Sequence, residues 1–261
     1  MGCATFFDKR GGNPETLSYT YDDAGNIETV KENGVLKATY HYDQFGRLIR
    51  EDNAWAGKTY VYVYDEGGNI TQCREAAYTT GSIAAYTGGS TYSYATGVAG
   101  DGDPVWKDQL INYNGTTIRY DAIGNPLNWG PEFPDIRWSR GNRLVYLQNR
   151  SQMVTYTYDE SGLRTRKYNG SKYTYYDRDA SGNLVHETRN NGKDHLYYYY
   201  DANGSIGSIN YNGVRYAFRK NLQGDVIATL DTSGKYLRRL GKGTVSDGCQ
   251  WQRQHVLYLY W

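Results

Sequence analysis

The sequence predicts an all-β protein built from tandem β-hairpins, and three observations lead to this prediction. Tyrosine and glycine are unusually frequent, with 29 Tyr and 31 Gly in 261 residues, which favours short strands, tight turns and amphipathic rings. One seven-residue motif occurs nine times, mostly at intervals of about 20 residues. Asn-Gly dipeptides, which are typical of hairpin turns, lie between copies of the motif.

The motif consists of an aromatic residue, Asp, two variable residues, Gly, a polar residue and an aliphatic residue. The first copy runs from Tyr21 to Ile27, and the copy at Trp138 is one residue shorter than the others. The nine copies begin at Tyr21, Tyr42, Tyr64, Tyr120, Trp138, Tyr158, Arg178, Tyr200 and Lys220.

Each motif is typical of a turn at one end of a hairpin. Asp followed three residues later by Gly favours a type I turn in which Gly supplies the positive φ that closes a bulged hairpin. The Asp side chain is an acceptor for backbone N–H groups of its own turn, so a structural role is favoured over paired catalytic carboxylates. The structural turn positions are Asp22, Gly25, Asp43, Gly46, Asp65, Gly68, Asp121, Gly124, Asp159, Gly162, Asp179, Gly182, Asp201, Gly204 and Gly224.

The segments between the turns alternate as β-strands do. Residues 39–42, 60–64 and 155–158 place Tyr at every second position among β-formers. Asn-Gly, whose residues both tolerate positive φ, predicts the opposite turn of each unit. These dipeptides are Asn33-Gly34, Asn114-Gly115, Asn169-Gly170, Asn191-Gly192 and Asn212-Gly213. The units together predict a long, curved antiparallel sheet that forms part of a β-cocoon.

The repeats organise the chain into three parts. Residues 1–16 form a leader, residues 17–240 form the repeat region, and residues 241–261 form a divergent tail. Residues 77–109 show no clear motif, although their length could hold one or two degraded copies. No capped amphipathic helix is expected.

Composition excludes several classes of function. With 29 Lys and Arg against 28 Asp and Glu, the charge is too balanced for a nucleic-acid binder that acts through a basic field. The mean hydropathy is −0.78, and no apolar run approaches the roughly 18 residues of a membrane-spanning helix. Cys3, Cys73 and Cys249 are odd in number and widely spaced, so they are interpreted as incidental thiols.

In its repeated Tyr-Asp motif, the chain resembles the RHS-repeat, or YD-repeat, proteins of bacteria. These proteins are related to the shell of animal teneurins. The resemblance covers about residues 17–240 and includes two longer passages, 106–127 and 220–228, that are similar to clostridial RHS proteins. It implies a sheet that spirals into a hollow shell around a C-terminal toxin or effector of the same polypeptide. The parent family is secreted or on the cell surface, although residues 1–10 show no signal-peptide pattern, and the localisation stays open.

The chain also departs from the family pattern. Family shells have more repeats, and many end in an Asp-Pro motif that frees the toxin by self-cleavage. Here Asp103-Pro104 stands mid-chain, so no cleavage residue is carried over. The sequence is therefore expected to be a fragment of a shell, truncated or frameshifted, with no room for a toxin domain.

No catalytic, cofactor-binding or metal-binding residue is assigned. The histidines His41, His186, His195 and His255 are scattered along the sequence, and a metal site would require two or more of them to converge. No Gly-x-Ser-x-Gly elbow supports a Ser-His-Asp triad.

The sequence therefore predicts a non-enzymatic structural protein whose partners are the remainder of a larger shell and its toxin cargo. The alternative is a cell-surface carbohydrate-binding repeat module, because rows of rings can stack on sugars or bases. Such modules rely on Trp-centred pockets, whereas here Tyr is regular and Trp is irregular. Strand edges and a ring-rich face predict self-association of the isolated chain.

Overall fold

The structure is a computed structural model, and it describes residues 2–6, 15–97, 106–130, 132–149, 151–221, 224–234 and 236–239. Asp103-Pro104, Cys249, His255, most of the leader and the whole tail 241–261 lie outside the described residues.

Ten strands form the first sheet. They are β1 (Gly2–Phe6), β2 (Glu15–Tyr21), β3 (Ile27–Glu32), β4 (Val35–Tyr42), β5 (Leu48–Asn53), β6 (Lys58–Tyr64), β7 (Ile70–Ala77), β8 (Tyr86–Tyr94), β9 (Leu110–Tyr113) and β10 (Thr116–Thr117).

Eleven strands form the second sheet. They are β11 (Asp135–Ser139), β12 (Arg143–Gln148), β13 (Met153–Tyr158), β14 (Arg164–Tyr168), β15 (Tyr173–Arg178), β16 (Leu184–Arg189), β17 (Asp194–Tyr200), β18 (Ile206–Tyr211), β19 (Val214–Lys220), β20 (Val226–Leu230) and β21 (Tyr236–Arg239). One short 3₁₀ turn, η1 (Asn190–Gly192), is the only helical element in the described residues.

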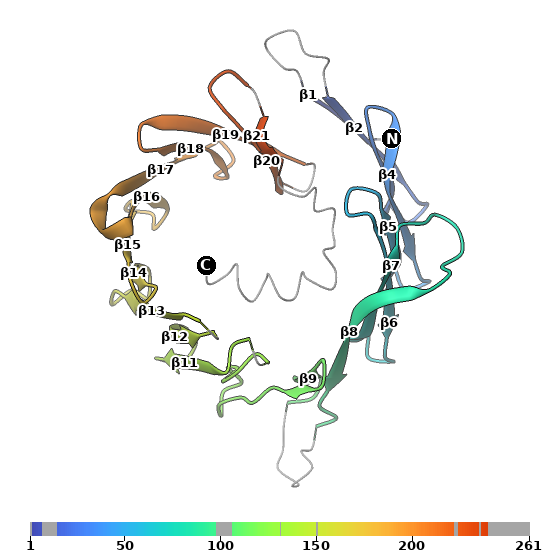
Figure 1. The fold of residues 1–261 in the computed structure, drawn as a ribbon, viewed down its shortest axis with the longest axis horizontal. Helices are drawn as coiled ribbons and strands as arrows, with labels where there is room; N and C mark the ends of the chain where they lie inside the picture. The colour runs from blue at the N-terminus through green and yellow to red at the C-terminus, as the bar shows by residue number, and fades with distance from the viewer. Residues whose placement is uncertain are drawn as a thin grey trace. The chain divides into compact units, whose positions relative to one another are not determined.

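In both sheets each strand lies beside the strands that precede and follow it in the sequence (Figure 1). The pairings from β1 to β8 and from β11 to β19 are antiparallel. The predicted all-β class and the chain of antiparallel hairpins are therefore confirmed. Among the described residues, those up to 110, those of 219–229 and those of 233–239 form one compact unit, and those of 111–218 and 230–232 form another.

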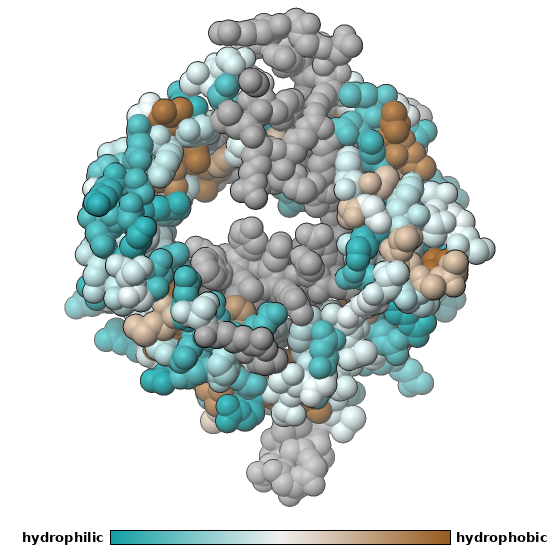
Figure 2. Space-filling model, in the orientation of Figure 1, coloured by the Kyte–Doolittle hydropathy of each residue, from teal (hydrophilic) through white to brown (hydrophobic). Residues whose placement is uncertain are grey.

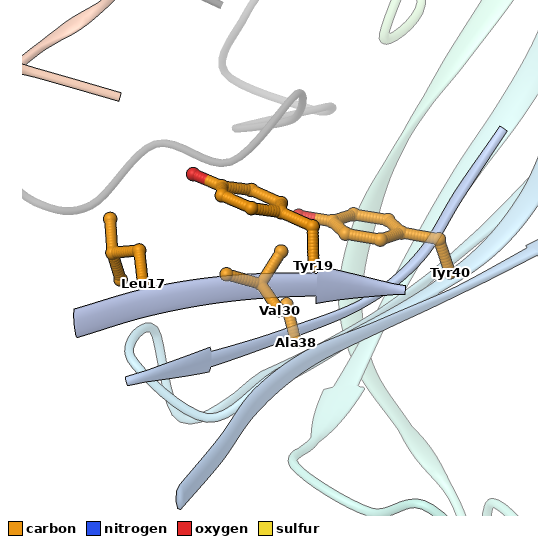
Figure 3. Packing of buried hydrophobic residues seen from close by; sticks show 5 residues of the cluster. All are labelled: Leu17, Tyr19, Val30, Ala38 and Tyr40. Atoms are coloured by element: carbon orange, nitrogen blue, oxygen red, sulfur yellow. The ribbon is translucent and has the colours of Figure 1, made fainter. Parts of the chain in front are cut away.

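One face of the first sheet carries its core. Leu17, Tyr19, Val30, Ala38 and Tyr40 are 1–3% exposed, and their side chains stand on the same side of β2, β3 and β4 (Figure 3). This arrangement follows from register, because Tyr19 pairs with Val30 and Val30 pairs with Ala38, and paired residues share a face.

Both sheets bury polar side chains beside apolar ones, and in the first sheet Glu51 is 0% exposed and is paired with Tyr40. In the second sheet Leu147, Val154, Tyr156 and Leu196 are buried, and so is Glu187, which is 5% exposed. Hydrophilic residues predominate on the surface shown in Figure 2, as the mean hydropathy predicts. No helix in the described residues has the length and apolarity needed to cross a membrane.

Three local features differ from the sequence analysis. Two Asn-Gly dipeptides are not two-residue turns. The Asn169 side chain accepts hydrogen bonds from the backbone N–H groups of Ser171 and Lys172 and closes a longer loop, and Asn191-Gly192 lies in η1, within the loop 190–193 between the paired residues Arg189 and Asp194. Cys73 is disulfide-bonded, so its interpretation as an incidental thiol is wrong. Strands β7 and β8 extend the sheet into the segment 77–109, where no motif was evident.

Candidate functional site

The motif forms a five-residue turn whose polar groups are hydrogen-bonded around the carboxylate of its Asp. In the first copy the N–H of Gly25 donates to the backbone oxygen of Asp22 at 3.0 Å, and the N–H of Asp22 donates to that of Asn26 at 2.9 Å. Asp22 Oδ1 accepts from the N–H groups of Ala24 and Asn26, and Oδ2 accepts from the Asn26 side chain. The turn thus satisfies most of its own polar groups within one motif.

The same backbone hydrogen bonds recur in the copies that contain Asp43, Asp65, Asp121, Asp159, Asp179 and Asp201. The motif glycines have φ between +75° and +91°, at Gly25, Gly46, Gly68, Gly124, Gly162, Gly182, Gly204 and Gly224. In the copies where the pairing is defined, the register shifts at the motif's first residue, as at Tyr21, Tyr42 and Tyr64. A type I turn followed by a glycine bulge produces this shift.

Hydrogen bonding lowers the pKa of several motif carboxyls. For Asp22, Asp121 and Asp179 the largest cause is the hydrogen bond from the side chain of the Asn four residues later, with further bonds from backbone N–H groups. Asp65 shows the same shift from the Asn69 side chain. These carboxylates are solvent-exposed turn acceptors, which is a structural environment rather than that of a general acid.

The last copy exchanges the two polar partners. Its sequence places Asn221 where most copies have Asp, and Asp225 where four of them have Asn, at Asn26, Asn69, Asn125 and Asn183. The Asn221 side-chain N–H₂ donates to Asp225 Oδ2 at 2.9 Å, and Asn221 Oδ1 accepts from the Asp225 N–H at 2.8 Å. An amide–carboxylate pair can thus stand in either order, although the copies with Arg47, Leu163 or Ser205 at the second position form the same backbone turn without the amide.

A second interaction, which we call the ring strut, links successive copies of the motif. The aromatic first residue of a copy donates its polar hydrogen to the backbone oxygen of the residue that ends the preceding copy. The struts are Tyr42 to Ile27 (2.9 Å), Tyr64 to Leu48 (2.7 Å), Tyr158 to Leu144 (2.8 Å), Tyr200 to Leu184 (2.9 Å) and Trp138 Nε1 to Pro126 (2.7 Å).

The strut also identifies a degraded copy that sequence reasoning did not locate. The Tyr94 hydroxyl donates to the backbone oxygen of Ile70 at 3.0 Å, and Ile70 ends the copy that begins at Tyr64. Tyr94 therefore occupies the first position of a copy whose turn has been replaced by a longer segment. Arg178 occupies the same position in its copy and instead donates to the backbone oxygen of Gly182.

On the buried face of the second sheet, charged and phenolic side chains form a cluster. Arg189 Nε and the Tyr198 hydroxyl donate to the two carboxylate oxygens of Glu187, at 2.5 and 2.6 Å. Arg164 lies over the Tyr156 ring, 4.2 Å from its centroid. Burial lowers the pKa of Lys167, and the nearby Arg189 and Arg164 add to this. Burial raises the pKa values of Tyr156 and Tyr198.

On the opposite face, two of the four histidines come together. His186 Nδ1 lies 2.7 Å from Asp177 Oδ2, and His186 Nε2 lies 3.1 Å from His195 Nδ1. His41 is in the first sheet, 3.7 Å from a carboxylate oxygen of Asp52. Sequence reasoning left the convergence of histidines open because it depends on strand register.

Within the described residues, no group of three or more His, Cys, Asp or Glu side chains is arranged to hold a metal ion. A shallow cavity of about 290 Å³ is lined by residues of β11–β13 and their turns, including Arg143 and Tyr156. The geometry at the motif positions is that of turns and struts, which hold strands in register.

Comparisons with known proteins agree with a hairpin-repeat class. No family model matches the chain. The chain is 30% identical over 236 residues to the tRNA3(Ser)-specific nuclease WapA of Bacillus spizizenii, covering 89% of this chain and 9% of that protein. It is 30% identical over 233 residues to the tRNA nuclease WapA of Bacillus subtilis, covering 87% of this chain and 9% of that protein. The chain thus spans a small part of these relatives.

Two solved structures share the fold. The TcdB2-TccC3-TEV structure matches with a TM-score of 0.58 and 14% identity, covering 86% of this chain and 13% of that one. TcdB2-TccC3 without its hypervariable C-terminal region matches with a TM-score of 0.57 and 14% identity, with the same coverage. The chain therefore has an RHS-like all-β fold.

Proposed function

We propose that this chain is a segment of an RHS-type shell, a non-enzymatic structural part of a longer polypeptide that encloses and delivers a toxin or effector. The observation that carries the proposal is the ring strut, which repeats from one motif copy to the next in both sheets. A protein that reuses one turn and one strut in successive hairpins is specialised for extending a sheet. To enclose a cargo, such a sheet needs only an unbroken series of hydrogen-bonded strands.

The relatives support this proposal and suggest its cargo class. The similar proteins from Bacillus are named as tRNA nucleases, and this chain aligns with about a tenth of their length. We infer that nuclease activity of this kind belongs to a cargo segment of the longer polypeptide. The residues of the present chain form part of the shell around it. The motif carboxylates are engaged with their own turns, which supports a structural role for them.

The test is to find the polypeptide that carries this sequence. An antibody raised against the 261-residue chain should detect a species much larger than 29.7 kDa in the source cells. That species should then be subjected to limited proteolysis, and the fragments identified by mass spectrometry. A segment outside the present 261 residues, the enclosed cargo, should resist digestion until denaturant opens the shell. Detection of a 29.7 kDa protein alone, or equal digestion of all segments before denaturation, would contradict the proposal.

A parallel assay addresses catalysis. The purified chain should leave tRNA intact under conditions in which a WapA nuclease cleaves it. Cleavage that copurifies with the chain through several columns would show that these residues are catalytic after all. A matched preparation of Gly162→Val, whose fold we expect to be weakened, separates intrinsic cleavage from a contaminant.

A second candidate function is carbohydrate binding, and a specific surface favours it. Tyr175, Tyr197 and Tyr199 are 43–44% exposed, and all three lie on the face of β15 and β17 that also carries His186. Exposed rings of this kind stack on sugars. A glycan array with the wild-type chain and a Tyr197→Ala/Tyr199→Ala variant tests this: binding that the variant loses supports a carbohydrate module.

Self-association of the isolated chain is a related proposal. Strand edges offer backbone groups to another copy. Sedimentation velocity should show oligomers that increase with protein concentration, whereas a clean monomer at high concentration would contradict this.

A further inference from the structure

A row of three polar side chains crosses adjacent strands on the exposed face of the second sheet. Asp177 lies on β15, His186 on β16 and His195 on β17. Asp177 and His186 are directly paired across the strands, and His195 is diagonal to His186, whose own partner on β17 is Tyr197. The row is built by register, and it is independent of the function proposed above.

The hydrogen bonds fix which nitrogen of His186 is available. An ionised carboxylate only accepts hydrogen bonds, so the 2.7 Å contact between Asp177 Oδ2 and His186 Nδ1 places a proton on Nδ1. In the neutral ring, Nε2 then carries the lone pair and points toward His195. Histidines that bind metals are oriented in this way, with the second nitrogen donating to a carboxylate.

The separation of the two facing nitrogens suits a single ion. His186 Nε2 and His195 Nδ1 are 3.1 Å apart. Two nitrogen ligands at about 2.0–2.1 Å from a tetrahedral ion lie roughly 3.3 Å from each other. A small rotation of the rings therefore converts the hydrogen-bonded pair into a pair of ligands, with no movement of the strands.

The His186 ring and the His195 backbone are positioned before any ion binds, so that only a ring rotation remains. The His186 ring stacks on the Tyr197 ring, with centroids 4.4 Å apart, and lies within 5° of parallel to the His195 ring. The backbone of His195 is fixed by Asn212, whose side-chain oxygen accepts from the His195 N–H at 2.7 Å and whose N–H donates to the His195 oxygen at 2.9 Å. Preorganised side chains lose less entropy on binding.

We propose that His186 and His195 form a two-nitrogen site for a divalent transition-metal ion such as Zn²⁺, with Asp177 orienting the His186 ring. Imidazole nitrogens favour zinc, copper and nickel over magnesium and calcium. With two protein ligands, the remaining coordination positions belong to water or to a group from a partner molecule. The ion joins β16 to β17 and presents open positions on the exposed face.

Calorimetric titration of the full chain with Zn²⁺ tests the proposal, with Mg²⁺ as the control ion. We expect one zinc ion per chain and no magnesium binding. His186→Gln and His195→Gln should each abolish the zinc binding, and Asp177→Ala should weaken it by about 10–100-fold because the ring loses its orienting carboxylate. Imidazole ¹⁵N resonances should shift on zinc addition at His186 Nε2 and His195 Nδ1.

His41→Gln is the matched control, because His41 lies in the first sheet against Asp52 and should leave zinc binding unchanged. Circular dichroism and melting temperature without metal establish that each variant is folded, and the ¹⁵N shifts in the wild-type chain need no variant. Zinc binding that survives both the His186→Gln and His195→Gln changes, or a wild-type chain that binds zinc no better than magnesium, would overturn the proposal.

Discussion

In the first sheet the residue that ends each motif copy is apolar, as in Ile27 and Leu48, which pack against the core cluster. In the second sheet the copy that begins at Tyr158 ends in Arg164, and the next copy begins with Arg178 instead of an aromatic residue. Both sheets nevertheless keep the same turn, the same bulge and a regular antiparallel ladder. The backbone geometry is thus set by the turn's hydrogen bonds, and the buried face can be filled with either apolar or charged side chains.

The largest expected effect comes from removing apolar packing in the first sheet. Leu17 is 2% exposed, and Leu17→Ala should destabilise the chain by about 2–5 kcal/mol because it leaves a cavity. Arg164→Ala in the second sheet should cost less, about 0.5–2 kcal/mol, because it removes polar contacts of the guanidinium, among them its position over the Tyr156 ring, rather than apolar packing. Urea unfolding measures both. Equal losses would show that the two buried faces contribute alike.

A smaller effect is expected at the motif glycines. Gly162→Val and Gly25→Val place a β-branched residue at φ of +86° and +85°, and each should cost about 1–3 kcal/mol in strain. A Cβ at Gly162 would also meet the Arg143 guanidinium, whereas nothing lies within 4 Å of one at Gly25. Gly162→Val should therefore lower the melting temperature more, and an unchanged melting temperature for it would refute the turn assignment.

The ring strut should contribute about 0.5–1.5 kcal/mol per copy, the usual net value of one hydrogen bond. Tyr64→Phe in the first sheet and Tyr158→Phe in the second each remove only the hydroxyl that bonds Leu48 or Leu144. Thermal unfolding should show similar losses for the two variants. A loss in one sheet alone would mean that the strut matters only where the surroundings are apolar.

Introducing a tyrosine at a strut position that lacks one should raise the free energy of unfolding, by a smaller amount than the changes above lower it. Arg178→Tyr restores an aromatic residue at the one strut position where Arg stands, and its hydroxyl is expected to reach the backbone oxygen of Arg164. We expect stabilisation below about 1 kcal/mol, measured by chemical unfolding, because the Arg178 bond to Gly182 is lost in exchange. Destabilisation would show that this region requires its arginines.

Acid should weaken both sheets together. The pKa values of Asp22, Asp65 and Asp179 are lowered from 3.8 in the folded chain, so their stabilisation is present above that pH and is lost as the pH falls below it. The melting temperature should therefore fall as the pH is lowered below about 4, and less steeply in the triple variant with Asn at these positions. An equal fall in both proteins would contradict this origin.

The turns could be predicted from sequence because the hydrogen bonds that define them, between backbone groups and to the Asp carboxylate, are local. Asp22, Gly25 and Asn26 lie within five consecutive residues, and their chemistry is readable from spacing alone. The strut from Tyr94 to Ile70 and the pair His186–His195 could not be predicted, because they depend on which residues face each other across strands. The loop at Asn169 was missed because the Asn side chain competed with the turn that Asn-Gly normally favours.

The ring strut also gives the chain a direction of assembly. Because each ring completes the copy before it, a newly synthesised hairpin stays unfinished until roughly 20 further residues have left the ribosome, a delay of about one to four seconds at ordinary elongation rates. Folding would then advance from the N-terminal side one hairpin at a time, each locked by its successor. A sheet that extends in this order has its N-terminal strands locked in register before its C-terminal strands have been made.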